Sequence, residues 1–167
     1  VHAIIDRDGK RQVKVIATRL HRPNGLAFHN GALYVAELSK VWRYDSIEEN
    51  LDTPPNPTLI SDQFPKDEPH GWKFIKVGPD GKLYLPVGAP CNICEPNSDE
   101  YAHIRRLNLD GSGMEIVARL EADGYFVREF SVAAVAERVV NVAVGVGGEQ
   151  RGDGREVEFV RTRGQLL

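Results

Sequence analysis

A short hairpin pattern occurs twice in this chain, 50 positions apart, and it restricts the folds that the chain can adopt. Residues 31–35 read Gly-Ala-Leu-Tyr-Val, and residues 81–85 read Gly-Lys-Leu-Tyr-Leu. Asp-Gly turns at residues 8–9 and 110–111 form a second pair, and a similar strand-like run follows each of them. Asp-Gly between apolar runs is a strong signal for a β-hairpin. The sequence therefore predicts an all-β chain made of repeated hairpins.

The period of the repeat indicates which all-β fold is present. Self-similarity at about 40 to 50 residues, with four strands in each unit, is typical of a β-propeller, whereas an unrelated β-sandwich would share the turns only by coincidence. We expect one full blade near residues 23–61, another near residues 70–119, and the last half of a further blade before residue 20. These two to three blades do not close a ring, so residues 1–119 are predicted to be a partial β-propeller.

The character of the sequence changes after residue 119. Beyond Leu120 all six basic residues are arginine, and valine is frequent. Alternation predicts strands at residues 139–146 and 156–160, and the alanine content of residues 131–138 is compatible with a short helix. We therefore treat residues 120–167 as a divergent tail of uncertain structure, such as a change of reading frame would produce.

Composition argues against two kinds of partner. The formal net charge is -3 and 27% of the residues are charged, with no basic stripe, so a nucleic-acid partner is not expected. No apolar run reaches the roughly 18 residues that a transmembrane helix requires, so no membrane span is expected.

The cysteines of the chain, Cys91 and Cys94, form one Cys-x-x-Cys motif. Such a motif is compatible with a local disulfide, a redox pair or half of a zinc site. Structural zinc needs two further ligands, and the sequence shows no second motif of that kind. A redox pair usually lies at a helix N-terminus, whereas this motif follows a predicted strand. A local disulfide is the favoured interpretation.

One histidine stands in a suggestive position. His70 precedes an apolar segment, residues 72–74, and a Gly-Pro-Asp-Gly turn follows at residues 78–81. We expect His70 at the start of a strand, on one rim of a sheet, where an imidazole can be held firmly and still face a cavity. A rim histidine is also compatible with a solvated or structural role.

Four segments together resemble the glucose/sorbosone dehydrogenase family: residues 22–28, 31–37, 70–74 and 87–96. The resemblance covers about residues 15–119. It implies a six-bladed β-propeller quinoprotein, an oxidoreductase that oxidises an aldose at C1 with pyrroloquinoline quinone and calcium and then passes electrons to an acceptor. It also implies a periplasmic or secreted protein, although the chain shows no signal peptide, and in such a compartment Cys91 and Cys94 should pair.

The resemblance assigns one catalytic residue. His70 matches the general base that takes the proton from the C1 hydroxyl while hydride passes to the quinone C5. In the family an aspartate precedes this histidine and orients it, whereas this chain has Pro69 there, with Asp67 and Glu68 just before. The ligands of the cofactor and of calcium come from later blades of the family, so none is assigned here. The chain alone is therefore expected to be inactive.

Two other functions remain open. One is a non-enzymatic β-propeller module that offers a face to proteins or glycans. The other is a lactonase-like propeller hydrolase, whose metal site would use carboxylates and amides near the central channel. Asn24 and Glu37 are its candidate ligands, although a turn amide and a strand-end carboxylate also occur for structural reasons.

Overall fold

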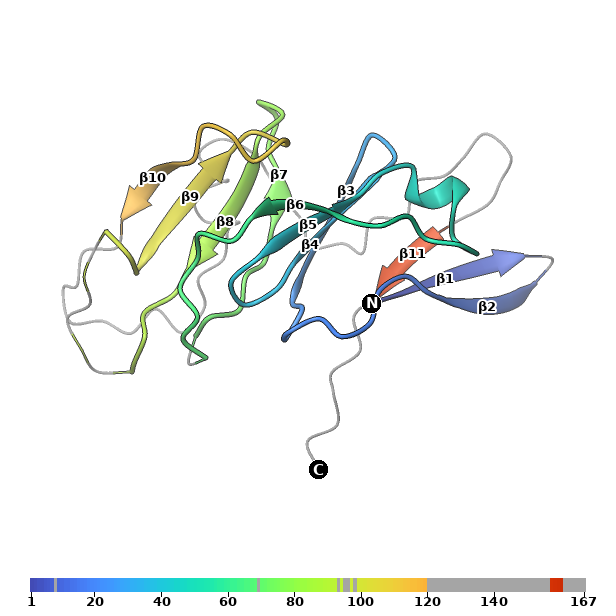
Figure 1. The fold of residues 1–167 in the computed structure, drawn as a ribbon, viewed down its shortest axis with the longest axis horizontal. Helices are drawn as coiled ribbons and strands as arrows, with labels where there is room; N and C mark the ends of the chain where they lie inside the picture. The colour runs from blue at the N-terminus through green and yellow to red at the C-terminus, as the bar shows by residue number, and fades with distance from the viewer. Residues whose placement is uncertain are drawn as a thin grey trace.

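The computed structural model describes residues 1–7, 9–68, 70–92, 94, 97, 99–119 and 157–160, and these form an all-β structure. Three antiparallel sheets follow one another (Figure 1). Their strands are β1 (His2–Arg7), β2 (Lys10–Val15), β3 (Gly25–His29), β4 (Ala32–Ala36), β5 (Val41–Tyr44), β6 (Thr58–Ser61), β7 (Lys76–Val77), β8 (Leu83–Val87), β9 (His103–Leu107), β10 (Glu115–Arg119) and β11 (Val157–Val160). One 3-10 helix, η1 (Ile47–Glu49), lies between β5 and β6.

The middle sheet is a four-stranded meander in the order β3-β4-β5-β6. His29 pairs with Ala32, so a two-residue loop joins β3 to β4. Both loop residues have positive φ, 48° at Asn30 and 77° at Gly31, as the type I′ turn of a tight hairpin requires. This sheet confirms the blade expected near residues 23–61, with β6 at its edge.

The second four-stranded sheet has the order β10-β9-β8-β7 and confirms the blade expected near residues 70–119. Its first strand corrects the sequence prediction, because β7 covers Lys76–Val77 alone and the apolar segment 72–74 is not a strand. The backbone of this segment packs against the start of β3, where a Cβ added at Gly25 would overlap the carbonyl oxygen of Lys73. Residues 72–74 thus pack against the sheet that contains β3 and do not pair with β8 as a strand.

The third sheet has the order β11-β1-β2. The strand predicted at residues 156–160 is present as β11, which pairs antiparallel with β1, Ile5 opposite Val157 and His2 opposite Val160. The helix and the strand considered for residues 131–138 and 139–146 lie outside the described residues. The boundary of the tail at residue 119 therefore stays a prediction.

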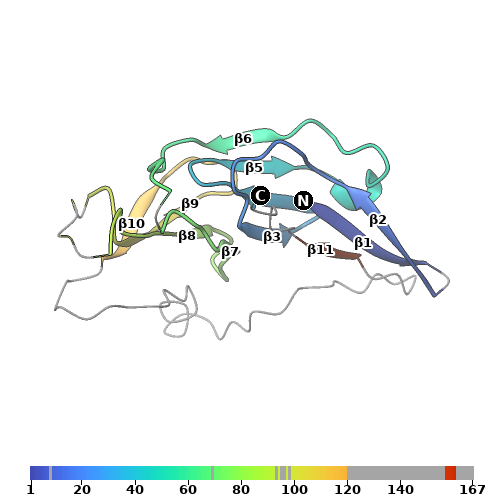
Figure 2. The same ribbon diagram turned by 90° about the horizontal axis from the view of Figure 1, so that it is seen from below.

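The middle sheet buries both of its faces, because every residue of β4 is buried. Leu33 and Val35 point into one apolar cluster with Ala3 of β1. Tyr34 and Ala36 point into the other cluster, together with the residues of the second four-stranded sheet that pack there: Leu83, Leu85, Val87 and Leu107. Sheets stacked face to face in chain order are the arrangement of propeller blades, and Figure 2 shows the same stack from below.

The antiparallel order gathers the connections at two opposite rims. The described residues of the loops at 37–40, 62–75 and 88–102 all lie where β4, β6 and β8 end, and we call this end the His70 rim. The turns at residues 30–31 and 78–82 lie at the other end, which we call the turn rim. Segments that are up to 65 positions apart in sequence, from residue 37 to residue 102, therefore share the His70 rim.

Candidate functional site

His70 lies on the His70 rim but not at the start of a strand. It is an exposed turn residue with φ of 54°, and β7 begins only at Lys76. A positive φ is uncommon for a residue with a Cβ, so neighbouring groups must hold this backbone in place. The expectation of a strand-start histidine is thus corrected to a histidine displayed on a turn.

Two contacts from one loop hold His70. The His70 Nε2 atom lies 2.6 Å from the Oδ1 atom of Asn92. A Cβ added at Gly88 would overlap the carbonyl oxygen of His70, so glycine at this position lets the loop after β8 approach closely. An amide oxygen can only accept, so this contact is a hydrogen bond when Nε2 carries the proton, and the lone pair of a neutral imidazole is then on Nδ1. The arrangement presents a proton acceptor on an exposed turn.

The two acidic residues before the turn have other partners. Asp67 accepts a hydrogen bond of 2.6 Å from the Tyr101 hydroxyl, and this bond raises the pKa of Tyr101 to about 12. Glu68 lies 2.9 Å from Arg22 and 3.6 Å from His21. The contact that the structure gives the His70 ring comes instead from Asn92, 22 positions away, and nothing in the sequence distinguished Asn92 from other loop residues.

Lys73 is fully buried on this rim, with 1% of its surface exposed. Its ammonium donates to the carbonyl oxygens of Leu38 and Gly71 and lies 5.3 Å from the ring centre of Phe64. Burial, followed by the positive charge of Arg105, lowers the pKa of Lys73 to about 8. Lys73 thus joins the β4–β5 loop to the segment before β7, a role that the sequence did not reveal.

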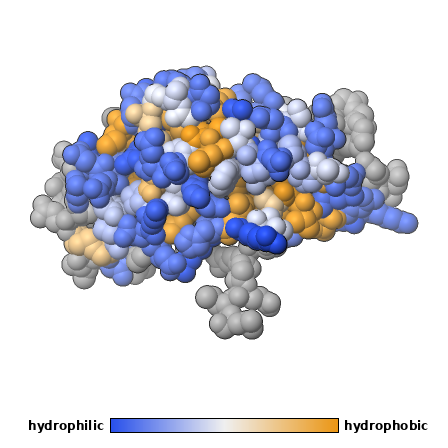
Figure 3. All heavy atoms as spheres, in the orientation of Figure 1, coloured by the Kyte–Doolittle hydropathy of each residue, from blue (hydrophilic) through white to orange (hydrophobic). Residues whose placement is uncertain are grey.

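The neighbours of Lys73 alternate with it and face outward. Trp72 is 57% exposed and Phe74 is 51% exposed. Exposed aromatic rings of this size are common at binding surfaces, because they offer a large contact area with little conformational freedom to lose. Figure 3 shows the mixture of apolar and polar residues on one face of the molecule.

The Cys91 and Cys94 sulfurs are joined in the structure, and the two Cα atoms are 6.0 Å apart, a separation usual for a disulfide. The pairing in the natural protein stays a prediction. Among the described residues, no group of three or more His, Cys, Asp or Glu side chains is placed to hold a metal ion.

The candidate ligands of the hydrolase interpretation come together at the His70 rim. The Asn24 backbone N–H donates to the Ala36 carbonyl at 2.9 Å, which places Asn24 beside Glu37, where β3 begins and β4 ends. Both residues are buried, at 9% and 7% exposure. Two residues fall short of a metal site, and the interpretation stays untested.

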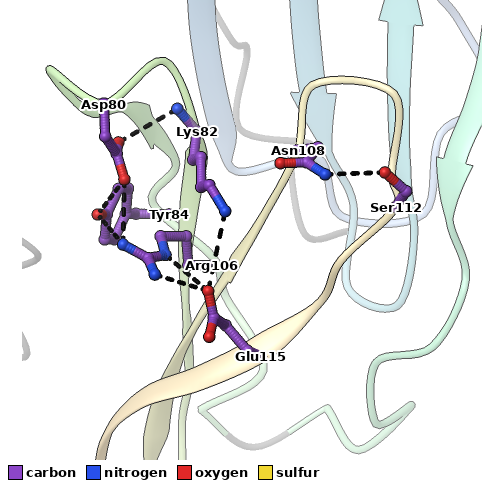
Figure 4. A network of polar contacts seen from close by, with 7 residues as sticks. All are labelled: Asp80, Lys82, Tyr84, Arg106, Asn108, Ser112 and Glu115. Carbon is purple, nitrogen blue, oxygen red and sulfur yellow. Dashed lines mark hydrogen bonds and ion pairs between the residues drawn. The ribbon is translucent and has the colours of Figure 1, made fainter.

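The turn rim carries a network of charged side chains rather than a candidate site (Figure 4). Arg106 lies 2.6 Å from Glu115 and 3.1 Å from Asp80, and its guanidinium is 5.8 Å from the ring of Tyr84. Tyr84 donates to Asp80 at 2.9 Å. These contacts connect the β7–β8 turn with β8, β9 and β10, so we interpret the network as structural.

Comparisons with known proteins gave distant structural similarities. No family model and no curated protein matches the sequence. A chain in the crystal structure of a nidogen/laminin complex has a TM-score of 0.43 and 14% identity, over 69% of this chain and 43% of that chain. The pyrroloquinoline quinone-bound aldose sugar dehydrogenase of Streptomyces coelicolor has a TM-score of 0.32 and 15% identity, over 65% of this chain and 49% of that one. The chain thus spans less than half of each.

Membrane insertion by a helix has no support in the part of the chain that the structure describes. None of its helical segments is long and apolar enough to cross a bilayer.

Proposed function

We propose that this chain is part of a sugar dehydrogenase and that His70 is its general base. One observation carries the proposal: the imidazole is exposed on the His70 rim, while Asn92 Oδ1 lies 2.6 Å from Nε2 and leaves Nδ1 as the proton acceptor. The resemblance of residues 70–74 and 87–96 to the glucose/sorbosone dehydrogenases supplies the reaction class. The substrate would be an aldose oxidised at C1.

The role of His70 is a single proton transfer. Nδ1 takes the proton of the C1 hydroxyl as the C1 hydrogen leaves with its electron pair, and a positioned base of this kind contributes about 10²–10⁴-fold to the rate. Bound pyrroloquinoline quinone would supply the hydride acceptor. In the family that the chain resembles, the ligands of the quinone and of calcium come from later blades, so other parts of the protein would hold the cofactor. A periplasmic or secreted location belongs to the same proposal.

The test uses the protein with its remaining blades, an aldose and a dye acceptor. His70→Ala should lower turnover by about 10²–10⁴-fold and leave quinone binding, read from its absorbance, nearly unchanged. His29→Ala is the matched control, because His29 lies at the far end of β3, next to the turn rim, and should keep turnover within about twofold. Undiminished turnover in His70→Ala would remove His70 from the mechanism.

The 167-residue chain gives a second test. Because the family's ligands for quinone and calcium come from later blades, it should show no dye reduction when supplied with quinone and calcium. Robust activity of this chain would contradict the inference that the cofactor is held elsewhere.

The exposed rings of Trp72 and Phe74 favour a second candidate, a non-enzymatic module that binds a glycan. Binding would then need no cofactor. Calorimetric titration of the chain with oligosaccharides should show binding that Trp72→Ala abolishes and His70→Ala preserves. Hydrolysis of a lactone with calcium alone would instead support the hydrolase interpretation.

A further inference from the structure

We infer that Asn92, held by the Cys91–Cys94 loop, is a positioning residue that fixes which nitrogen of His70 carries the proton. The inference concerns the imidazole itself, and its catalytic meaning rests on the proposed function. It connects the Cys-x-x-Cys motif, which the proposed function leaves without a role, to His70.

The geometry places Asn92 inside the ring that the Cys91–Cys94 disulfide closes. Cys91 and Cys94 flank it, and their Cα atoms are 6.0 Å apart. Closing a ring over so few residues removes most of the backbone freedom that an exposed loop would otherwise have. The disulfide therefore restricts the backbone that carries the Asn92 side chain toward His70.

The same loop also supports the backbone of His70. Gly88 packs directly against the His70 carbonyl, and Asn92 contacts the ring at 2.6 Å. His70 has φ of 54°, a conformation that a residue with a Cβ rarely keeps unless its surroundings hold it. Backbone and ring are thus both fixed by the segment that leaves β8.

The chemical consequence is a choice of tautomer. The Asn92 Oδ1 atom accepts from Nε2–H, which leaves the lone pair on Nδ1. With Asn92 removed or mobile, the Nδ1–H form becomes accessible, and in that form Nδ1 cannot accept a proton. Reduction of the disulfide by a dithiol adds two electrons and two protons, breaks the S–S bond to give two thiols, and oxidises the reagent to its own disulfide. Reduction of the disulfide should therefore release the Asn92 side chain from its contact with the His70 ring.

The test reads the ring nitrogens of His70 by ¹⁵N NMR in the oxidised 167-residue chain, at about pH 9, where imidazole is neutral. We expect the Nε2–H form. Asn92→Ala should lower the ratio of Nε2–H to Nδ1–H about fivefold, which corresponds to about 1 kcal/mol, the usual net worth of one hydrogen bond. Asn50→Ala is the matched control, because the Asn50 side chain donates to Ser46 near the turn rim. It should leave the ratio unchanged.

The disulfide is tested separately. Reduction of the wild-type chain and the double variant Cys91→Ser/Cys94→Ser should each change the ratio in the same direction as Asn92→Ala. The His29 signals, recorded in the same spectra, report whether the fold is intact, and reduction in place serves if the double variant does not fold. An unchanged ratio after reduction would overturn the role of the disulfide.

Two results would overturn the positioning role itself. One is an Nδ1–H form in the wild-type chain, and the other is a ratio that Asn92→Ala leaves unchanged. Neither depends on turnover. If Asn92→Ala changes the tautomer while His70→Ala leaves turnover intact, the positioning role stands and the proposed base is wrong.

Discussion

The buried ammonium of Lys73 gives a prediction about stability that can be worked from the structure. Replacement by methionine keeps most of the side-chain volume and removes the charge. It also removes the donor to the carbonyl oxygens of Leu38 and Gly71, and each unsatisfied acceptor costs about 1–3 kcal/mol. At any one pH, the stability lost with these hydrogen bonds is offset by the stability gained when a buried charge is removed. The informative quantity is therefore the change of the free energy of unfolding with pH.

The sign follows from the pKa of Lys73, which burial lowers from 10.5 in the unfolded chain to about 8 in the folded protein. Between these values the unfolded chain binds more protons, so the free energy of unfolding rises with pH. At 1.36 kcal/mol for each pH unit, charge burial costs about 3 kcal/mol at pH 7, and about 2.5 kcal/mol of this is recovered by pH 10.

The assay is urea unfolding of the wild-type chain and of Lys73→Met at pH 7, 8, 9 and 10. The raised pKa values of Tyr34, Tyr44 and Tyr101 affect both proteins alike, so the difference between the two proteins isolates Lys73. We expect the wild type to gain about 2.5 kcal/mol relative to Lys73→Met over this range. A constant difference from pH 7 to pH 10 would refute the reasoning, because it would mean that Lys73 titrates as it does in the unfolded chain.

Three further predictions follow from the packing, the charge network and the cysteines. Leu85→Ala should lower the free energy of unfolding, measured in urea, by about 3 kcal/mol, because Leu85 is fully buried between the two four-stranded sheets. A loss below about 1 kcal/mol would count against that packing. The Arg106 guanidinium lowers the pKa of Glu115, so the stabilisation from this ion pair is present above the usual carboxyl range and is lost as pH falls through the lowered pKa. Arg106→Ala should therefore reduce the midpoint of urea unfolding at pH 7 and reduce it much less at pH 3. Equal reductions at the two pH values would contradict the ion pair. Intact-mass analysis after alkylation should find Cys91 and Cys94 protected in natively secreted protein, with a stabilisation at the low end of about 2–4 kcal/mol, and two alkylated thiols would exclude the disulfide.

The blades were predictable from the sequence because their signals are local. Asn30-Gly31 demands positive φ at two successive positions, and the structure has a tight hairpin there. The short pattern of residues 31–35, which returns at residues 81–85, then identified β4 and β8 as equivalent strands of two sheets. These features need only neighbours in sequence, so single-chain patterns are sufficient to identify them.

The candidate site was less predictable because its contacts span long distances in sequence. Residues 72–74 read as an apolar strand, yet the aromatic residues face outward and Lys73 faces inward, since two carbonyl groups are available for its ammonium. The carbonyl of Leu38 is 35 positions away from Lys73, and Asn92 is 22 positions away from His70. Such partners follow from how the blades pack, which no local pattern encodes.

The pairing of β11 with β1 has a consequence for how the protein is made. The partners Ile5 and Val157 are separated by 152 positions, whereas the β1–β2 hairpin closes over a few residues. At about 5–20 residues per second, a ribosome needs roughly 8–30 s to travel between them. During that interval the inner edge of β1 has open backbone hydrogen-bonding groups, and such edges invite pairing with other chains. Among the described elements this sheet is therefore the last to be completed during synthesis, and its open edge is a place where a nascent chain can misassemble.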